Sequence, residues 1–314
     1  MISVSKLARA GSLGLTGRAG EAPTSHLAAS RSKKLDCLSR QLTGEKSKTP
    51  LPRLTYLHRH VAEAQTTQTF PTMNIGIIGA GYIGSALAVR LTSLGYTVYI
   101  ANSRGPETLQ DVAQKTGATP VTAQEAAQRG TDFIVVTIPL EKIPDLPRDL
   151  FADVPAEVPI IDTSNYYPLL RDGQIPELET GDLTESGWVQ QHLGRPVVKV
   201  FNNIFAAHLE NNGKPAGTPG RIALPVASDD AAAKQKVMQL VEELGFDALD
   251  GGTMRESWRQ QPGGPIYCND LPADQVQQHL ASLGTERTPE QHAEFLANQA
   301  KAEQAMQAQG IKLK

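Results

Sequence analysis

Short apolar runs alternate with segments of helical periodicity over most of this chain. Residues 75–78 are an apolar run suited to a buried parallel strand, and apolar residues then recur at helical spacing: Ile83, Leu87, Leu91 and Leu94. The same criteria predict strands at 96–101, 119–121, 132–139, 158–163, 196–201, 221–226 and 246–249, and helices at 123–128 and 231–244. Alternating strands and helices build a mainly parallel sheet with right-handed crossovers. The expected fold class is therefore α/β with a doubly wound sheet, which the last two strands are expected to join.

Three glycines connect the first strand to the first helix in the pattern Gly79-Ala80-Gly81-Tyr82-Ile83-Gly84. Gly79 allows a tight turn, Gly81 lets the backbone approach a pyrophosphate, and Gly84 lets helix and strand pack closely. The N-terminus of the following helix offers free N–H groups to phosphates. Together with the strand and the helix, this motif predicts a dinucleotide-binding Rossmann fold. The alternative is a glycine-rich turn that binds no ligand.

The residues after the second predicted strand indicate which dinucleotide binds. NAD-binding folds place an acidic residue here, about 20 residues beyond the glycines, to accept hydrogen bonds from the ribose 2′-OH. This chain has Asn102-Ser103-Arg104 instead. Ser103 can donate a hydrogen bond to a 2′-phosphate and Arg104 can pair with it, so the sequence predicts NADP as the cofactor. The alternative is that Arg104 only points into solvent.

Polar and turn residues follow three further strands. Because ligands of such sheets bind outside the carboxyl ends of the strands, we expect these segments to line one crevice. The cofactor-binding residues predicted there are Thr137, Ile138, Pro139, Asn165 and Asn202.

The ordered series of these motifs resembles a known family. Besides Gly79–Gly84, Asn102–Arg104 and Thr137–Pro139, it includes Asp162-Thr-Ser-Asn165, Lys199-Val-Phe-Asn-Asn203, the segment 221–230 and the segment 244–250. Residues 74–255 are similar to the NADPH-dependent deazaflavin reductases, which pass hydride between NADP and coenzyme F420, and to the nucleotide-binding part of the STEAP metalloreductases. The resemblance implies that Ser103 and Arg104 grip the 2′-phosphate, that Thr137–Pro139 contact adenosine and nicotinamide, and that the Phe201-Asn202 segment closes over the nicotinamide.

The chain departs from this resemblance after residue 255. Two helices are predicted at 272–283, with Gly284 as C-cap, and at 289–309, where Phe295, Leu296, Ala302 and Met306 form a thin apolar stripe. These helices are expected to pack on the surface, to cover the active site, or to join the subunits of a homodimer. The domains are therefore predicted as a tail at 1–72, an NADP-binding Rossmann domain at 73–255 and a helical lobe at 256–314.

The first 72 residues have a different composition. The segment before Asn74 carries a net charge of +7 and the rest carries −10. The tail is rich in Ser, Thr, Gly and Gln without an apolar period, which predicts disorder. It is either an organellar transit segment or an extension upstream of a true start at Met73, which would leave a cytoplasmic protein. The acidic body gives no basic face for nucleic acid.

Other sites and partners are constrained by what the sequence lacks. The sequence contains no apolar run of 18 residues, so it predicts no membrane-spanning helix. Cys37 and Cys268 are too far apart in sequence to indicate a zinc site. We predict no metal and no membrane partner. No nucleophile and base stand in a recognisable motif, so the catalytic residues are unknown and His208 is a weak candidate. Four aromatic residues are candidates for stacking on a second ring: Tyr166, Tyr167, Trp258 and Tyr267.

Hydride transfer between two organic cofactors needs little acid-base help from the protein. The leading hypothesis is an NADPH-dependent oxidoreductase whose partner is a flavin-like or deazaflavin-like hydride acceptor. One alternative is a reductase of a small carbonyl or imine, in the manner of pyrroline-carboxylate reductases. The other is a non-catalytic NADPH-binding sensor.

Overall fold

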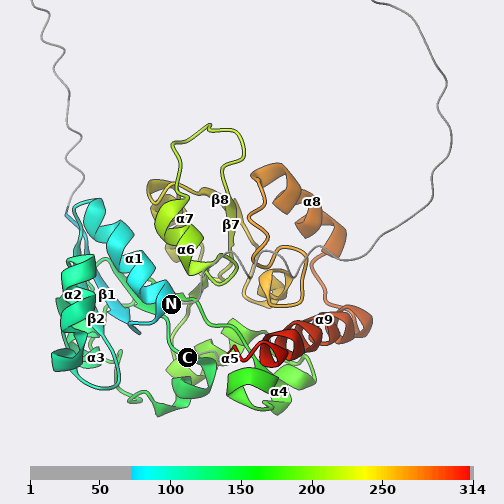
Figure 1. Cartoon of the computed structure of the whole chain (residues 1–314), viewed down its shortest axis with the longest axis horizontal. Helices are drawn as coiled ribbons and strands as arrows, with labels where there is room; N and C mark the ends of the chain where they lie inside the picture. The colour runs from blue at the N-terminus through cyan, green and yellow to red at the C-terminus, as the bar shows by residue number, and fades with distance from the viewer. Residues whose placement is uncertain (1–71, 312–314) are drawn as a thin grey trace, which may run out of the picture. The chain divides into compact units, whose positions relative to one another are not determined.

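A six-stranded parallel sheet forms the centre of the computed structural model, which describes residues 72–311 (Figure 1). Its strand order is β3-β2-β1-β4-β5-β6. The strands are β1 (Asn74–Ile78), β2 (Thr97–Ala101), β3 (Thr119–Pro120), β4 (Phe133–Val136), β5 (Ile160–Asp162) and β6 (Val198–Lys199). This is the doubly wound Rossmann order, in which the chain changes direction of winding between β1 and β4. The predicted fold class is confirmed. The six predicted strands of this sheet are present: β1 begins one residue earlier than predicted, and the other five are shorter than predicted.

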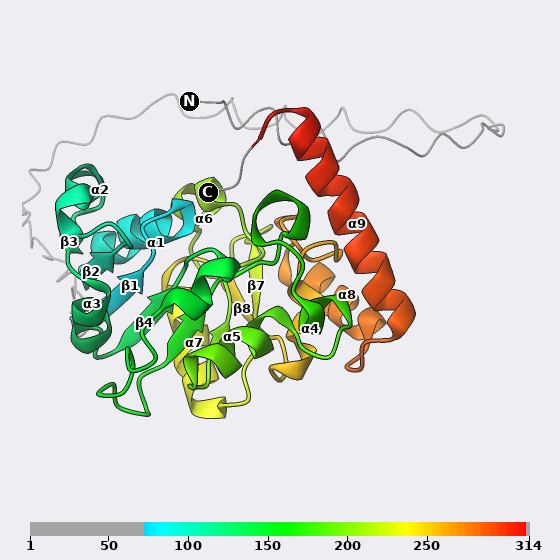
Figure 2. The same cartoon turned by 90° about the horizontal axis from the view of Figure 1, so that it is seen from below.

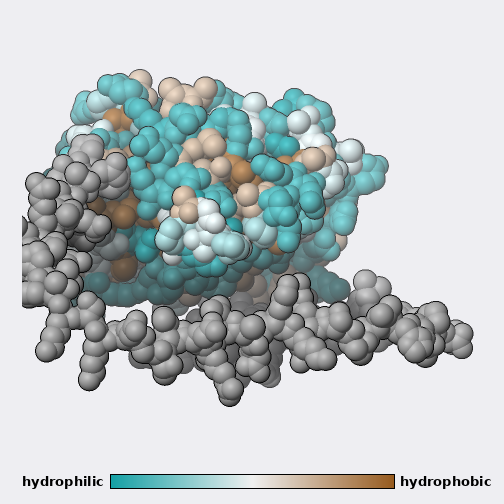
Figure 3. All heavy atoms as spheres, turned by 90° about the horizontal axis from the view of Figure 1, so that it is seen from above, coloured by the Kyte–Doolittle hydropathy of each residue, from teal (hydrophilic) through white to brown (hydrophobic). Residues whose placement is uncertain are grey.

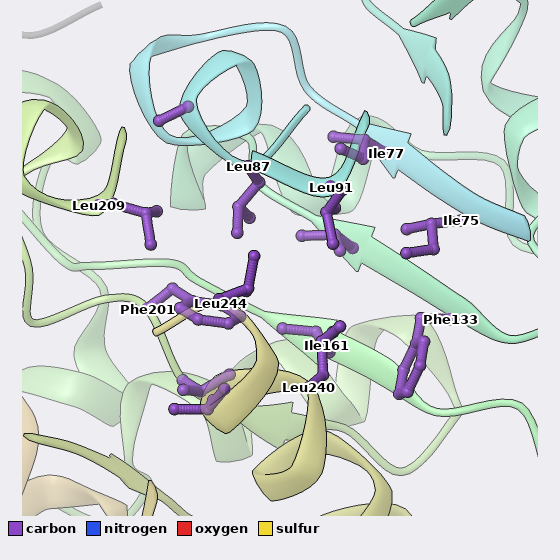
Figure 4. Packing of buried hydrophobic residues seen from close by; sticks show 14 of the residues in the cluster. Ile75, Ile77, Leu87, Leu91, Phe133, Ile161, Phe201, Leu209, Leu240 and Leu244 are labelled. Atoms are coloured by element: carbon purple, nitrogen blue, oxygen red, sulfur yellow. The ribbon is translucent and has the colours of Figure 1, made fainter. Parts of the chain in front are cut away.

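Both faces of the sheet are buried, because successive strand residues point to opposite sides. Ile75 and Ile77 join one hydrophobic cluster, whereas Ile78 joins the other. In the first cluster, Leu87 and Leu91 of α1 point into the apolar space that also holds Phe201 and Leu244 (Figure 4). This burial on both faces explains why the strands read as continuous apolar runs.

Helices cover each face of the sheet. The first cluster holds buried residues of α1 (Tyr82–Ser93), α6 (Ala206–Asn211) and α7 (Ala231–Glu243), and α2 (Gln110–Thr116) contacts α1. The second cluster holds residues of α3 (Ala123–Arg129), α4 (Pro176–Glu179) and α5 (Glu185–Leu193). The predicted helices at 123–128 and 231–244 are confirmed. Asp230 caps α7, because its carboxylate accepts the N–H groups of Ala232 and Ala233.

The last two strands do not join the main sheet as predicted. β7 (Ala223–Val226) and β8 (Asp247–Asp250) form a separate parallel pair. A single antiparallel bridge between Lys199 and Ala227 connects this pair to the end of β6. β6 is only two residues long, because the chain turns away at Phe201, whose φ is 62°. The pairing between β6 and the segment after β7 is therefore limited to this one bridge.

The C-terminal region contains α8 (Ala273–Leu283) and α9 (Pro289–Ala308), with Gly284 as the predicted C-cap of α8. Figure 2 shows α9 running along the side of the domain, next to α4 and α8. The predicted apolar stripe of α9 was wrong in part, since Ala302 is exposed while Gln299 and Glu303 are buried with Phe295. The predicted division at residue 255 stays a prediction, and one cluster with Ala223, Ile266 and Val276 crosses it. The predicted tail lies, apart from Thr72, outside the described residues.

Within residues 72–311, no helix combines the length and the apolar character needed to cross a bilayer. The same residues contain no group of three or more His, Cys, Asp or Glu side chains placed to hold a metal ion.

Candidate active site

The glycine turn leaves the carboxyl end of β1 and is shaped by close backbone contacts. Gly79 has a φ of 122°, and a Cβ atom on it would lie 2.2 Å from the carbonyl oxygen of Thr137. A Cβ on Gly84 would lie 1.9 Å from the carbonyl oxygen of Gly79. A Cβ on Gly81 would meet no atom within 4 Å. Packing within the chain thus requires Gly79 and Gly84, whereas Gly81 faces open space in which a phosphate group fits.

The N-terminus of α1 begins at this open space. Gly81 is its N-cap, no side-chain hydrogen bond caps it among the described residues, and its first turn has no acidic residue. Free N–H groups and the positive end of the helix dipole therefore face the position expected for the phosphates. Ala80 and Ile83 pack on the first cluster, while the Tyr82 side chain is 77% exposed.

The segment Thr137-Ile138-Pro139 lies against the glycine turn, as expected for a shared crevice. The N–H of Thr137 donates to the carbonyl of Ile78, and the Thr137 methyl group packs against Gly84. All three residues are half-buried. Because β1 and β4 flank the point at which the strand order reverses, these two segments occupy the position at which such folds bind dinucleotides.

Ser103 and Arg104 are both exposed in the turn after β2. Asn102 fixes this turn, since its side chain accepts the N–H of Arg104 at 3.0 Å and donates to Thr108 at 2.9 Å. In the described residues no hydrogen bond or ion pair engages the guanidinium of Arg104. It is free to bind an anion at the carboxyl end of β2.

Asn165 and Asn202 lie together after β5 and β6. The Asn202 side chain is 2% exposed and donates to Asn165 Oδ1 at 3.1 Å and to the carbonyl of Gln260 at 2.8 Å. Gln260 donates to Asn202 Oδ1, so the Asn202 amide is fully engaged. Asn165 is half-buried, and a ligand can contact its side chain more readily than that of Asn202. Both residues remain predicted cofactor contacts, and Asn202 holds Asn165 in place.

Behind these asparagines lies a buried charge network at the ends of β5 and β6. Lys199 Nζ is 3.5 Å from Glu185 Oε2 and 3.7 Å from Asp162 Oδ2, and it donates to the carbonyl of Ser164. All these groups are buried. Burial raises the pKa of Glu185 to about 7, against the opposing effect of Lys199. Burial therefore favours the protonated form of the Glu185 carboxyl.

The candidate stacking aromatics divide into two pairs. Trp258 and Tyr166 are fully buried, and the Tyr166 hydroxyl donates to Glu179 at 2.6 Å, so these two residues are structural. Tyr167 and Tyr267 are half-buried and their hydroxyls contact each other beside Asn165. Desolvation raises the pKa of both phenols, which keeps them protonated.

His208 is on α6 and has an acidic partner that the sequence did not indicate. Its Nδ1 lies 2.5 Å from Oδ2 of Asp270, and both side chains are about 30% exposed. The ring of Phe205, 38% exposed, contacts the His208 ring edge-on with the centroids 5.3 Å apart. Asp270 has a φ of 51°, in the left-handed region that non-glycine residues seldom adopt, and such strain is frequent at functional sites.

Three large hydrophobic side chains are exposed in the described part of the chain: Tyr82, Leu169 and Phe205. They follow β1, β5 and β6 respectively, so all three belong to segments at the carboxyl-end edge of the sheet. The face visible in Figure 3 is mostly hydrophilic, with hydrophobic side chains in small groups. An aromatic side chain such as Tyr82 or Phe205 offers a flat apolar surface on which a ring can stack.

A dinucleotide cofactor fits the residues present. Gly81 leaves open space at the N-terminus of α1, Arg104 is available for a phosphate, and buried acceptor or hydroxyl atoms without partners in the described residues occur after β5 and β6, on Ser164 and Asn203. Sequence reasoning missed the roles of Lys199, Glu185, Gln260 and Asp270. Lys199 and Asp162 could have been noticed as charges within apolar strands, whereas Glu185, Gln260 and Asp270 have no local signal because distant segments bring them here.

The fold is that of the Rossmann class, and its turns at the carboxyl ends of β1, β2 and β4 form a candidate dinucleotide site. Residues 74–166 match the family model described as NADP oxidoreductase, coenzyme F420-dependent. This match agrees with the resemblance that the sequence motifs indicated.

Individual proteins are similar to parts of this chain. Over 65 residues the chain is 48% identical to the protein YjhV of Escherichia coli strain K12; the match spans 21% of this chain and 47% of that relative. The chain thus spans about half of the length of this curated relative. The hypothetical protein SMa0349 of Sinorhizobium meliloti has a similar structure, with 29% identity and a TM-score of 0.52, over 62% of this chain and 93% of that chain. A structure from Arthrobacter sp. FB24, named as a candidate F420-dependent NADP reductase, shares 21% identity with a TM-score of 0.49, over 59% and 87%.

Proposed function

We propose that this protein is an NADPH-dependent oxidoreductase that transfers a hydride between NADP(H) and a flavin-like or deazaflavin-like acceptor. The observation that carries the proposal is the arrangement at one sheet edge. An open glycine turn and a free Arg104 suit NADP, and the exposed Tyr82, Leu169 and Phe205 suit a flat partner ring. The family of residues 74–166 supports it.

Some residues of this chain would bind the phosphates of the cofactor, and others would orient its nicotinamide ring. The N–H groups of α1 and the Gly81 turn would hold the pyrophosphate, and Ser103 with Arg104 would hold the 2′-phosphate. Asn165, fixed by Asn202 and Gln260, would orient the nicotinamide side. When bound, NADPH supplies the hydride, and the protein's main contribution is to hold the two rings in reactive contact.

A second candidate function is reduction of a small carbonyl or imine. Such a reaction needs a proton donor beside the substrate, and the His208–Asp270 pair and the Tyr167–Tyr267 pair both provide protonatable groups near Asn165 and Asn203. We expect the protein to act without a membrane, metal or nucleic-acid partner, and α8 and α9 remain a candidate homodimer contact.

The test is NADPH oxidation with a panel of acceptors: free flavins, a deazaflavin, ferric chelates and small carbonyls and imines. Turnover with flavin-type acceptors is the expected result. Turnover only with carbonyls or imines would replace the first proposal by the second. Tight NADPH binding in calorimetry without turnover on any acceptor would contradict both and indicate an NADPH-binding sensor.

A further inference from the structure

The His208–Asp270 pair is a group of titratable side chains at the ligand edge to which the proposed transfer to a flavin-like acceptor gives no role. Nδ1 of His208 lies 2.5 Å from the Asp270 carboxylate, although the residues are 62 positions apart and belong to different parts of the fold. The geometry points to His208 as the group that delivers a proton to the acceptor, with Asp270 as the residue that positions it. This inference rests on the proposed function.

The reaction consumes a proton that such a group would supply faster than water does. Addition of a hydride to a conjugated ring, a C=O or a C=N bond leaves negative charge on an oxygen or nitrogen of the acceptor, so each turnover consumes one proton. His208 Nε2 would deliver this proton: its N–H bond breaks while an O–H or N–H bond forms on the acceptor. Water then returns a proton to the imidazole, and atoms and charge balance without any further reactant.

The two ring nitrogens of His208 have different surroundings: Nδ1 faces Asp270, and Nε2 is left for the acceptor. Asp270 Oδ2 lies 2.5 Å from Nδ1, although the angles of this contact are not those of a hydrogen bond. A carboxylate that accepts a hydrogen bond from Nδ1 fixes the tautomer and the orientation of an imidazole. In the described residues no hydrogen bond occupies Nε2, so that nitrogen can meet a substrate or water. His208 is about 30% exposed, which allows it to exchange protons with solvent.

The position of the pair also agrees with a role at the acceptor. His208 lies on α6, which begins directly after the Asn202–Phe205 segment at the end of β6. Asp270 is in a segment anchored to the same place, because the N–H of Cys268 donates to the carbonyl of Asn203 at 2.9 Å. The exposed ring of Phe205 packs on His208, so an acceptor ring resting on Phe205 would lie beside the imidazole.

Other titratable groups around the pair are poorly suited to the task. Burial raises the pKa of the Cys268 thiol to about 12, so it holds its proton at neutral pH. Glu210, also on α6, is paired with Lys115 at 3.0 Å. Tyr267 remains protonated because burial raises its pKa, and its hydroxyl is already in contact with Tyr167. The tyrosine pair is nevertheless the rival donor that an experiment must separate from His208.

The experiment compares His208→Gln, Asp270→Asn and Tyr267→Phe with the wild type in the full-length protein, using the acceptor that turns over best. His279→Gln on α8 is the matched control for loss of a histidine. We expect His208→Gln to lower kcat about 10²-fold or more, the usual contribution of a positioned acid, while the Kd for NADPH stays unchanged. Added imidazole should restore part of the activity of His208→Ala. Asp270→Asn should lower kcat less and alter its pH profile.

A measurement independent of turnover tests the pairing. In ¹⁵N NMR of histidine-labelled protein, assigned with His208→Gln, the neutral His208 ring should carry its proton on Nδ1, and Asp270→Asn should change this tautomer. Equal kcat in His208→Gln and wild type would overturn the inference, as would a loss in Tyr267→Phe alone or an Nε2 tautomer that Asp270→Asn leaves unchanged. Failure of the wild type with every acceptor would instead overturn the proposed function, and the tautomer would still test the pair.

Discussion

The two halves of the candidate site are built in different ways. The nucleotide half, around β1, β2 and β4, is made of turns that follow their strands directly, and a few backbone contacts such as Gly79 to Thr137 join them. The acceptor half is made by side chains far apart in sequence: Asn165 contacts Tyr267, and Glu303 of α9 binds the turn at Leu169 and Leu170. The first half is a property of local motifs, whereas the second exists only when the C-terminal region is packed in place.

The largest expected effect tests the nucleotide half. Gly84→Ala would place a Cβ atom 1.9 Å from the Gly79 carbonyl oxygen, a contact that only backbone movement can relieve. We expect a loss of about 3 kcal/mol or more in the free energy of unfolding, measured by urea denaturation.

Gly81→Ala is the matched control, because its Cβ meets open space. It should keep the wild-type stability and weaken NADPH binding about tenfold, or 1.4 kcal/mol, by occupying the space for the pyrophosphate. Equal stability of the two variants would show that the turn is not packed as described.

The second effect tests the buried charges behind the acceptor half. The pKa of Glu185 is raised from 4.5 to about 7 in the folded protein, so the folded state binds a proton that the unfolded state has lost across this range. Stability should therefore fall as the pH rises from about 4.5 to about 7, by roughly 3 kcal/mol from this group. Urea denaturation of the wild type and Glu185→Gln across this range measures it.

The difference in stability between the two proteins carries the result, since other groups titrate in both. The pH dependence should be shallower in Glu185→Gln. Parallel curves for the wild type and the variant would mean that Glu185 is ionised throughout, and that Lys199 outweighs its burial.

The third effect concerns cofactor choice in the nucleotide half. Arg104→Ala removes a charge-assisted hydrogen bond of about 1.5–3 kcal/mol, so the Kd for NADPH should rise about 10-fold to 100-fold while the Kd for NADH changes little. Isothermal titration with both cofactors measures this. Glu107→Gln, in the following turn, is the control, and it should keep or strengthen NADPH binding. A wild type that binds NADH and NADPH equally would contradict the NADP proposal.

The smallest effect tests the link between α9 and the acceptor half. Glu303 accepts the N–H groups of Leu169 and Leu170 at 3.0 and 2.9 Å, in the turn that follows Asn165 and Tyr167. Glu303→Gln weakens this attachment by about 1 kcal/mol, so we expect the acceptor KM to rise several-fold with the Kd for NADPH unchanged.

Glu294→Gln, on an exposed position of the same helix, is the control for this prediction and should change neither quantity. A change in NADPH binding with an unchanged acceptor KM would show that α9 supports the nucleotide half instead.

The sequence determined the nucleotide half by itself. Apolar runs identified the six strands of the main sheet, and the Gly79–Gly84 motif located the turn at which the winding reverses, because both depend on residues close together in the chain. The sequence also placed Ser103, Arg104, Thr137 and Asn165 in segments that follow strands, which the fold confirms. Their contacts with a cofactor remain predictions.

Only the tertiary structure decided the acceptor half. The separation of β7 and β8 from the main sheet followed from the brevity of β6, which periodicity does not measure. The sequence could not predict that α9 buries polar side chains. Burial of Gln299 and Glu303 is favourable only because the backbone of Tyr166 and Leu169 supplies their hydrogen-bond partners. His208 was a lone candidate in the sequence, and only the fold places the carboxylate of Asp270 2.5 Å from its Nδ1.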